Sequence, residues 1–83
     1  MKPLRQYEVV RVVRLLRDAQ HYDGWRFNKR PPRVGDTGTI VDILHLVGSP
    51  ENYVVEASLP DGTTLWPGDF SADELEPIYA DPG

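Results

Sequence analysis

Cysteine is absent from this 83-residue chain, and only two histidines, His21 and His45, are present. The absence of cysteine excludes disulfides and the zinc sites built from cysteine, which are common ways of stabilising a small domain. The two histidines are far apart and show no metal-ligand spacing, so we expect neither a metal nor another cofactor. Stability must then come from packing or from self-association of the chain.

Long hydrophobic runs are also missing. No apolar stretch approaches the roughly 18 residues that a membrane-spanning helix needs. Residues 1–5 are not followed by the apolar stretch of a signal peptide, so we expect a cytoplasmic protein with no membrane partner. A chain of this length is expected to form a single domain over residues 1–83, with its core within about residues 8–79.

Lysine and arginine are absent from the last fifty positions. All nine lysines and arginines lie between Lys2 and Arg33, where three acids accompany them, and the other ten acids follow Arg33. The first 33 residues therefore carry a net charge of +6 and the remainder −10. Two interpretations stay open. Strands from the two halves could pair these charges in space, or the fold could present a basic face to an acidic partner.

Four segments carry the patterns of β-strands. Residues 8–17 fit a helical stripe as well as a strand, but their valines favour the strand. Residues 34–44 contain two glycines, at positions 35 and 38, and continue as an alternating β-branched run. Residues 53–59 alternate apolar with polar side chains. The pair Asp61-Gly62 is typical of a tight hairpin leading into residues 64–66, so these last two strands should be antiparallel.

The chain also carries one helix-start signal. Ser71 and Glu74 have the spacing of a capping box, which predicts a single helical turn that is stopped by Pro77. Residues 75–79 would then bring a last short strand back to the core. The order of these elements predicts a mostly β protein, a single five-stranded SH3-like barrel with one short helical turn before the last strand.

Catalytic residue types occur without catalytic spacing. The serines lie in turn, strand and cap contexts with no strained elbow sequence. The acids Asp73, Glu74 and Glu76 are better explained as a cap and a solvated face than as an acid and base pair. The glycines at 35 and 38 lack the lysine and helix of a phosphate-binding loop. We therefore expect a protein that is not an enzyme.

One polar segment, residues 22–33, interleaves aromatic rings with cations. Rings offer stacking platforms, and arginines offer paired hydrogen bonds to carboxylate or phosphate. We predict that the segment recognises an acidic protein. Nucleic acid is a less favoured partner, because the pI is near 4.9. Alternatively the aromatics are packed, as expected for Trp66, and the cations merely solvated. The predicted contact residues are Tyr22, Trp25, Arg26, Phe27, Lys29, Arg30 and Arg33.

The chain resembles the bacterial family catalogued as domain of unknown function 4926. The resemblance lies in the valine-rich strand ending at residues 15–18 and in residues 34–41, 53–56 and 73–78. The longer segment from His21 to Arg33 departs from the family pattern. The resemblance implies a small barrel without assigned activity, acting as a protein-binding module with an immunity-like or antitoxin-like accessory role. A nucleic-acid-binding barrel of the KOW kind and an accessory subunit of a larger complex remain the alternatives.

Overall fold

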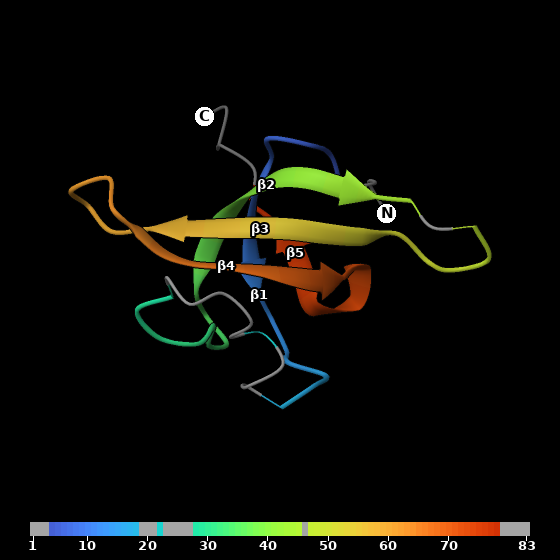
Figure 1. The fold of residues 1–83 in the computed structure, drawn as a ribbon, viewed down its shortest axis with the longest axis horizontal. Coiled ribbons are helices and arrows are strands. Elements are labelled where there is room, and N and C mark those ends of the chain that lie inside the picture. Colours follow the sequence, from blue (N-terminus) through green and yellow to red (C-terminus); the bar gives the residue numbers. More distant parts are fainter. Residues whose placement is uncertain (1–3, 19–21, 23–27, 46, 79–83) are drawn as a thin grey trace.

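Five antiparallel strands form one sheet in the computed structural model, which describes residues 4–18, 22, 28–45 and 47–78. The sheet order is β4-β3-β2-β1-β5 (Figure 1). This confirms the predicted mostly β fold with the strand order of an SH3-like barrel, in which β4 and β5 are the edges. The elements are β1 (Val9–Val12), β2 (Thr37–Leu44), β3 (Asn52–Ser58), β4 (Thr64–Ser71), the 3-10 turn η2 (Ala72–Glu74) and β5 (Leu75–Pro77).

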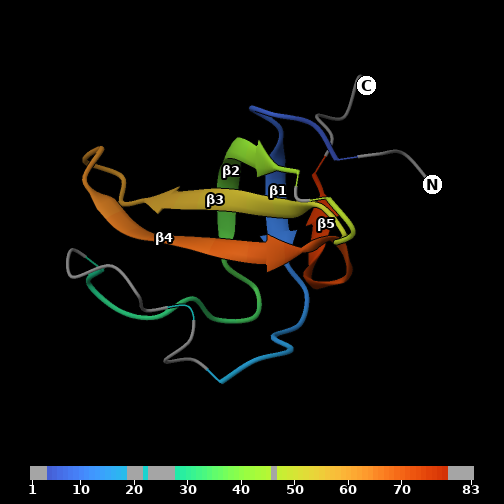
Figure 2. The same cartoon turned by 45° about the vertical axis from the view of Figure 1, so that its right-hand side comes forward.

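A bend in β2 turns this sheet into two facing layers. The start of β2 pairs with β1, and the rest of the strand pairs with β3. A register shift between Ile40 and Asp42 marks a β-bulge, which bends a strand and increases its twist. Figure 2 shows the consequence, since β1 crosses behind β3 and β4 at a steep angle. The core is enclosed between these layers.

The core is built from the inward side chains of alternate strand residues. In β3 the inward residues are Tyr53, Val55 and Ala57, as the alternation in sequence predicted. Trp66 is fully buried, which confirms its predicted place in the core. The ring of Phe70 lies between two other aromatic rings, with its centroid 5.6 Å from Trp66 and 5.1 Å from Tyr22. Apolar burial of this kind is the main stabilising contribution to folding.

Two strands differ in length from their sequence predictions. β1 is shorter than residues 8–17 and ends at Val12. One further bond, from the Val13 amide to the Glu74 carbonyl, precedes the point where the chain leaves the sheet. β4 is longer than residues 64–66 and continues through Pro67. The Pro67 carbonyl faces Asn28, away from β3, so the missing N–H of proline interrupts no bond to the neighbouring strand.

The two glycines before and within β2 have different roles. Gly35 has a φ of 97° and forms the turn that leads into the strand. Gly38 allows a close approach of two backbones, because a Cβ there would lie 2.8 Å from the Glu56 carbonyl oxygen. The predicted start of β2 through two glycines is therefore confirmed, with a steric reason for each.

The predicted capping box is formed at η2. Ser71 is the N-cap, and its amide donates to Glu74 Oε1 at 3.0 Å. The helical turn ends at Glu74, earlier than the stop predicted at Pro77, because Leu75 already pairs with β1. No helix in the described part of the chain is long and apolar enough to cross a membrane.

Tyr7 occupies a backbone conformation that disfavours side chains. Its φ is 70°, in a turn closed by the Glu8 amide bonding to the Arg5 carbonyl, and its side chain is 73% exposed. The left-handed region costs a non-glycine residue about 1–2 kcal/mol, and glycine avoids that cost. We expect Tyr7→Gly to be more stable than Tyr7→Ala by about 1 kcal/mol in urea unfolding. Both variants lose the same ring, so equal stabilities would show that the turn is not strained.

Candidate functional site

The predicted recognition segment is only partly exposed. The structure describes four of its seven predicted contact residues, and Trp25, Arg26 and Phe27 lie outside the described residues. Lys29 and Arg33 are exposed. Arg30 is half-buried, and Tyr22 is only 1% exposed. The segment therefore combines surface positions with positions that belong to the fold.

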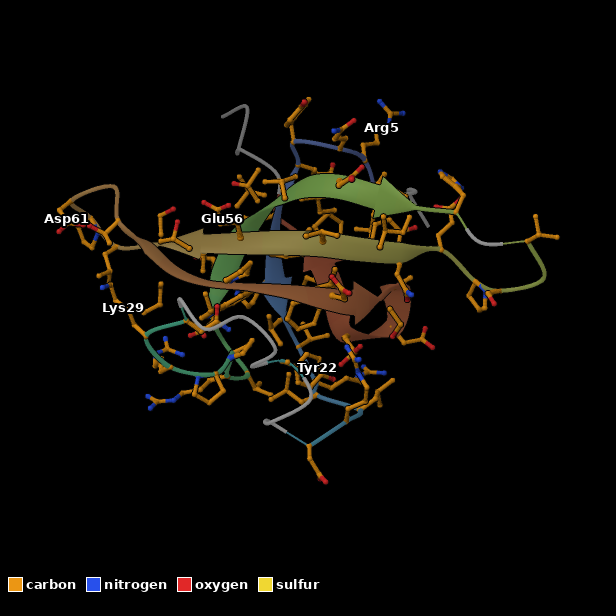
Figure 3. The ribbon with its side chains drawn as sticks, in the orientation of Figure 1. Arg5, Tyr22, Lys29, Glu56 and Asp61 are labelled. Atoms are coloured by element: carbon orange, nitrogen blue, oxygen red, sulfur yellow. The ribbon has the colours of Figure 1, made fainter. Side chains whose placement is uncertain are left out.

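Tyr22 is a core residue, and its prediction as a partner contact is wrong. Its ring stacks on Phe70, and its hydroxyl donates to Glu74 Oε2. The same hydroxyl oxygen accepts the amides of Leu16 at 3.2 Å and Arg17 at 3.1 Å. Figure 3 shows Tyr22 below β4. The residue joins the segment that follows β1 to the end of β4 and to η2.

Asp36 clamps the predicted segment to the barrel. Arg30 makes two parallel bonds to it, from Nη1 to Oδ2 at 2.7 Å and from Nη2 to Oδ1 at 2.9 Å. The Trp66 indole N–H donates to Oδ2 at 2.9 Å, and the Arg33 amide donates to it at 3.0 Å. Arg30 therefore acts as an internal clamp, and its role as a partner contact stays a prediction.

The charge state of Asp36 follows from these donors. Burial by itself raises the pKa of a carboxyl group. Here the hydrogen bonds from Arg30, Arg33 and Trp66 outweigh burial, so the pKa of Asp36 is lowered from its ordinary value. The hydrogen bond to Asp36 likewise raises the pKa of Arg30. Both partners are therefore charged at neutral pH, and their ion pair is intact there.

Residues between β1 and β2 also cover the outer edge of β4. Three successive outward carbonyls of β4 accept one donor each from this connection. The Lys29 amide donates to Leu65 O at 2.9 Å, Asn28 Nδ2 to Pro67 O at 3.4 Å, and the Arg17 guanidinium to Asp69 O. Uncovered strand edges invite pairing with other chains. The backbone of the connection is therefore part of the architecture, while some of its side chains face outward.

The structure partly resolves the two interpretations of charge asymmetry. Arg11 pairs with Glu76 at 3.1 Å, and Arg30 pairs with Asp36, so some opposite charges are indeed mixed in space. Among the described residues, four exposed cations of the connection have no carboxylate partner within ion-pair distance: Arg14, Arg17, Lys29 and Arg33. We call Arg17, Lys29 and Arg33 the basic edge.

Glu74 is a buried carboxylate whose oxygens are occupied by the protein's own donors. It is 2% exposed. Oε2 accepts from the Tyr22 hydroxyl and, at 3.1 Å, from the Leu16 amide, and Oε1 accepts the amide and hydroxyl of Ser71. Burial alone raises the pKa of Glu74, but these donors outweigh burial and lower it. The carboxylate is held ionised, as suits a structural anchor.

An open pocket of about 270 Å³ adjoins this anchor. Its walls come from the segment that follows β1, the start of β3 and the turn around η2. The lining residues are Leu16, Arg17, Asn52, Ser71 and Glu74. Arg17 is held in place there, because its guanidinium lies 4.3 Å from the centre of the Tyr22 ring. No group of three His, Asp or Glu side chains that could hold a metal ion occurs among the described residues.

Sequence reasoning missed Asp36, Arg17 and Asn28 as members of this site. The signal for Asp36 was a lone acid close behind four cations, which predicts an ion pair without saying which cation takes part. Arg17 belonged to a regular spacing of arginines and had no feature of its own. Glu74 was recognised as a cap, but its burial and its bond to Tyr22 carry no local sequence signal.

Comparisons of the chain with protein-family models, curated proteins and solved structures found no match. The resemblance to the family of unknown function 4926 therefore stays a prediction.

Proposed function

We propose that this chain is a non-catalytic protein-binding module whose basic edge holds an acidic partner. The observation that carries the proposal is the Asp36 clamp, which fixes the backbone of residues 28–36 while Lys29 and Arg33 stay exposed. A segment that is ordered before binding loses little conformational entropy when a partner docks. Cations placed on such a segment favour fast, salt-dependent association with an acidic surface.

The pocket extends this surface at one end. Arg17 lines the pocket, and Leu16 beside it is 60% exposed. An arginine can bind a carboxylate with two parallel hydrogen bonds, while an apolar side chain nearby gains from burial. The arrangement suits a partner segment that places an acidic residue next to an apolar one.

The non-catalytic part of the proposal is supported by what the carboxylates do. Asp36 and Glu74 each accept several donors from the protein, and the pKa of each is lowered. A general acid or base needs a pKa near the working pH and a lone pair or proton facing the substrate. An immunity-like or antitoxin-like role is the biological setting that we propose from the resemblance, and the cytoplasm is the compartment that we propose from the sequence.

Charge reversal of the basic edge tests this proposal. We expect Lys29→Glu with Arg33→Glu to weaken binding of a peptide of alternating glutamate and leucine by about tenfold or more at low salt. The salt dependence of binding should fall as well, because fewer ion pairs form. The measurement is a titration of ¹⁵N-labelled protein followed by amide chemical shifts. Arg30→Glu is unsuitable here, because it would break the clamp.

Arg5→Glu is the control, since it reverses an exposed cation on the far side of β3 from Lys29 (Figure 3). Its effect on peptide affinity should be small, and the single change Lys29→Glu gives the comparison at equal net charge. Unchanged affinity in the doubly reversed protein would overturn the proposal. Binding of single-stranded DNA through the basic edge, with no binding of the acidic peptide, would favour the nucleic-acid alternative.

A further inference from the structure

The outer face of β2, β3 and β4 carries carboxylates in neighbouring rows. The strand register places Asp42, Val54 and Asp69 side by side in one row. The next row contains Thr39, Glu56 and Pro67. Figure 3 shows Glu56 on this face of β3. We call these six residues, together with Leu44, the acidic face.

The acidic face has no cation of its own. Every lysine and arginine precedes β2 in the sequence, so none lies on the strands that form this face. Asp42 accepts only its neighbouring amide, at 2.9 Å, and Glu56 accepts the Thr64 hydroxyl at 3.1 Å among the described residues. Neither bond neutralises a charge. Both carboxylates can therefore gain from a cation supplied by another molecule.

Apolar side chains lie among these carboxylates. Val54 lies between Asp42 and Asp69 in its row, and Leu44, at the end of β2, is 37% exposed. Protein interfaces commonly combine an apolar centre with a polar, charged rim. The face therefore offers both kinds of contact to a partner with cations on an ordered surface.

Such a partner surface exists on the same chain, and it is the basic edge. We propose that the acidic face docks the basic edge of a second copy of this chain, an inference that rests on the proposed function and names its partner. Glu56 lies on the open face of β3, whereas Lys29 lies below the β3–β4 connection (Figure 3). Two acidic faces repel each other, so the contact joins unlike surfaces, head to tail.

Two complementary variants test this contact. The edge variant carries Lys29→Glu with Arg33→Glu, and the face variant carries Asp42→Lys with Glu56→Lys. We expect the wild type to self-associate in sedimentation equilibrium at low salt and to dissociate as salt rises. Each variant alone should be monomeric. Mixed in equal amounts, the two should associate, because the acidic face of the edge variant meets the basic edge of the face variant, and the reversed edge meets the reversed face.

A control with the same change in net charge separates a local contact from a general charge effect. Asp73→Lys with Glu76→Lys alters two exposed acids outside the face, and self-association should persist in this protein. Thermal melts of all variants confirm that each is folded. Loss of self-association in the control to the same degree as in the face variant would overturn the inference.

The failure of this inference can be told from failure of the proposed function. The second-copy inference fails if the wild type is monomeric or if the mixed variants do not associate. The binding module still stands in that case, provided that the edge variant binds the acidic peptide more weakly than the wild type. If the edge variant binds the peptide normally, the proposed function fails as well. A lysine-rich peptide that shifts the amides of the acidic face of a monomeric wild type would replace the second copy with a basic partner.

Discussion

Glu74→Ala is expected to lower the free energy of unfolding by about 3–5 kcal/mol, because each buried donor left without an acceptor costs about 1–3 kcal/mol. The substitution leaves the Tyr22 hydroxyl and the Leu16 and Ser71 amides without their common acceptor. Unpaired polar groups of this kind cost more than the bonds themselves contribute. The loss should be large because Glu74 joins the segment after β1, the end of β4 and η2.

Urea unfolding of three variants measures this effect. Tyr22→Phe removes only the hydroxyl and should cost about 1–2 kcal/mol, since the ring still stacks on Phe70. Glu74→Gln keeps one acceptor oxygen and should lie between the two, so it stays informative if the alanine variant does not fold. A loss below about 1 kcal/mol for Glu74→Ala would show that water in the adjoining pocket replaces the carboxylate.

Asp36→Ala is expected to cost about 3 kcal/mol, because it removes an acceptor that serves several donors in a partly buried site. The Trp66 indole N–H would lose its acceptor, and Arg30 would lose its ion pair. Arg30→Met is the matched control. It leaves Asp36 bonded to Trp66 and to the Arg33 amide, so its loss in urea unfolding should be clearly smaller. Equal losses for the two variants would mean that the ion pair alone carries the effect.

The Asp36 carboxylate should also make the free energy of unfolding depend on pH in the acidic range. The pKa of Asp36 is lower in the folded protein than its ordinary value of 3.8. At low pH the unfolded chain therefore binds more protons, and stability falls as pH drops. The contribution is complete above the ordinary value and is lost as pH falls through the folded value. Asp36→Asn should flatten this acid limb, and a limb as steep as in the wild type would contradict the assignment.

Local patterns in the sequence predicted the β-strands well. The alternation in β3 and the capping box at Ser71 involve residues a few positions apart, and backbone geometry alone determines how such neighbours are oriented. Strand ends were predicted less well, because a strand ends where its pairing partner ends. β1 stops after Val12, where the chain turns toward Glu74, and no residue near Val12 signals that change.

The candidate site was predicted from composition, and its exposed and buried residues could not be told apart in that way. Interleaved aromatics and cations marked the segment that contains Lys29 and Arg33, both of which are exposed. The same pattern was compatible with burial, and for Tyr22 burial is what the fold produces. Composition could not distinguish these outcomes, because an aromatic ring has the same chemistry in a core and at an interface.

By itself, the sequence determined the fold class, the order of the elements and the separation of charge along the chain. Only the tertiary structure decided which polar groups remain available to a partner. Tyr22 meets Glu74 across 52 positions, and Asp36 meets Trp66 across 30. Such pairs form only when the bent sheet brings distant strands together, and a buried polar group is stable only with its partner in place. The positions left outside these pairs, Lys29 and Arg33 among them, are therefore a property of the folded chain.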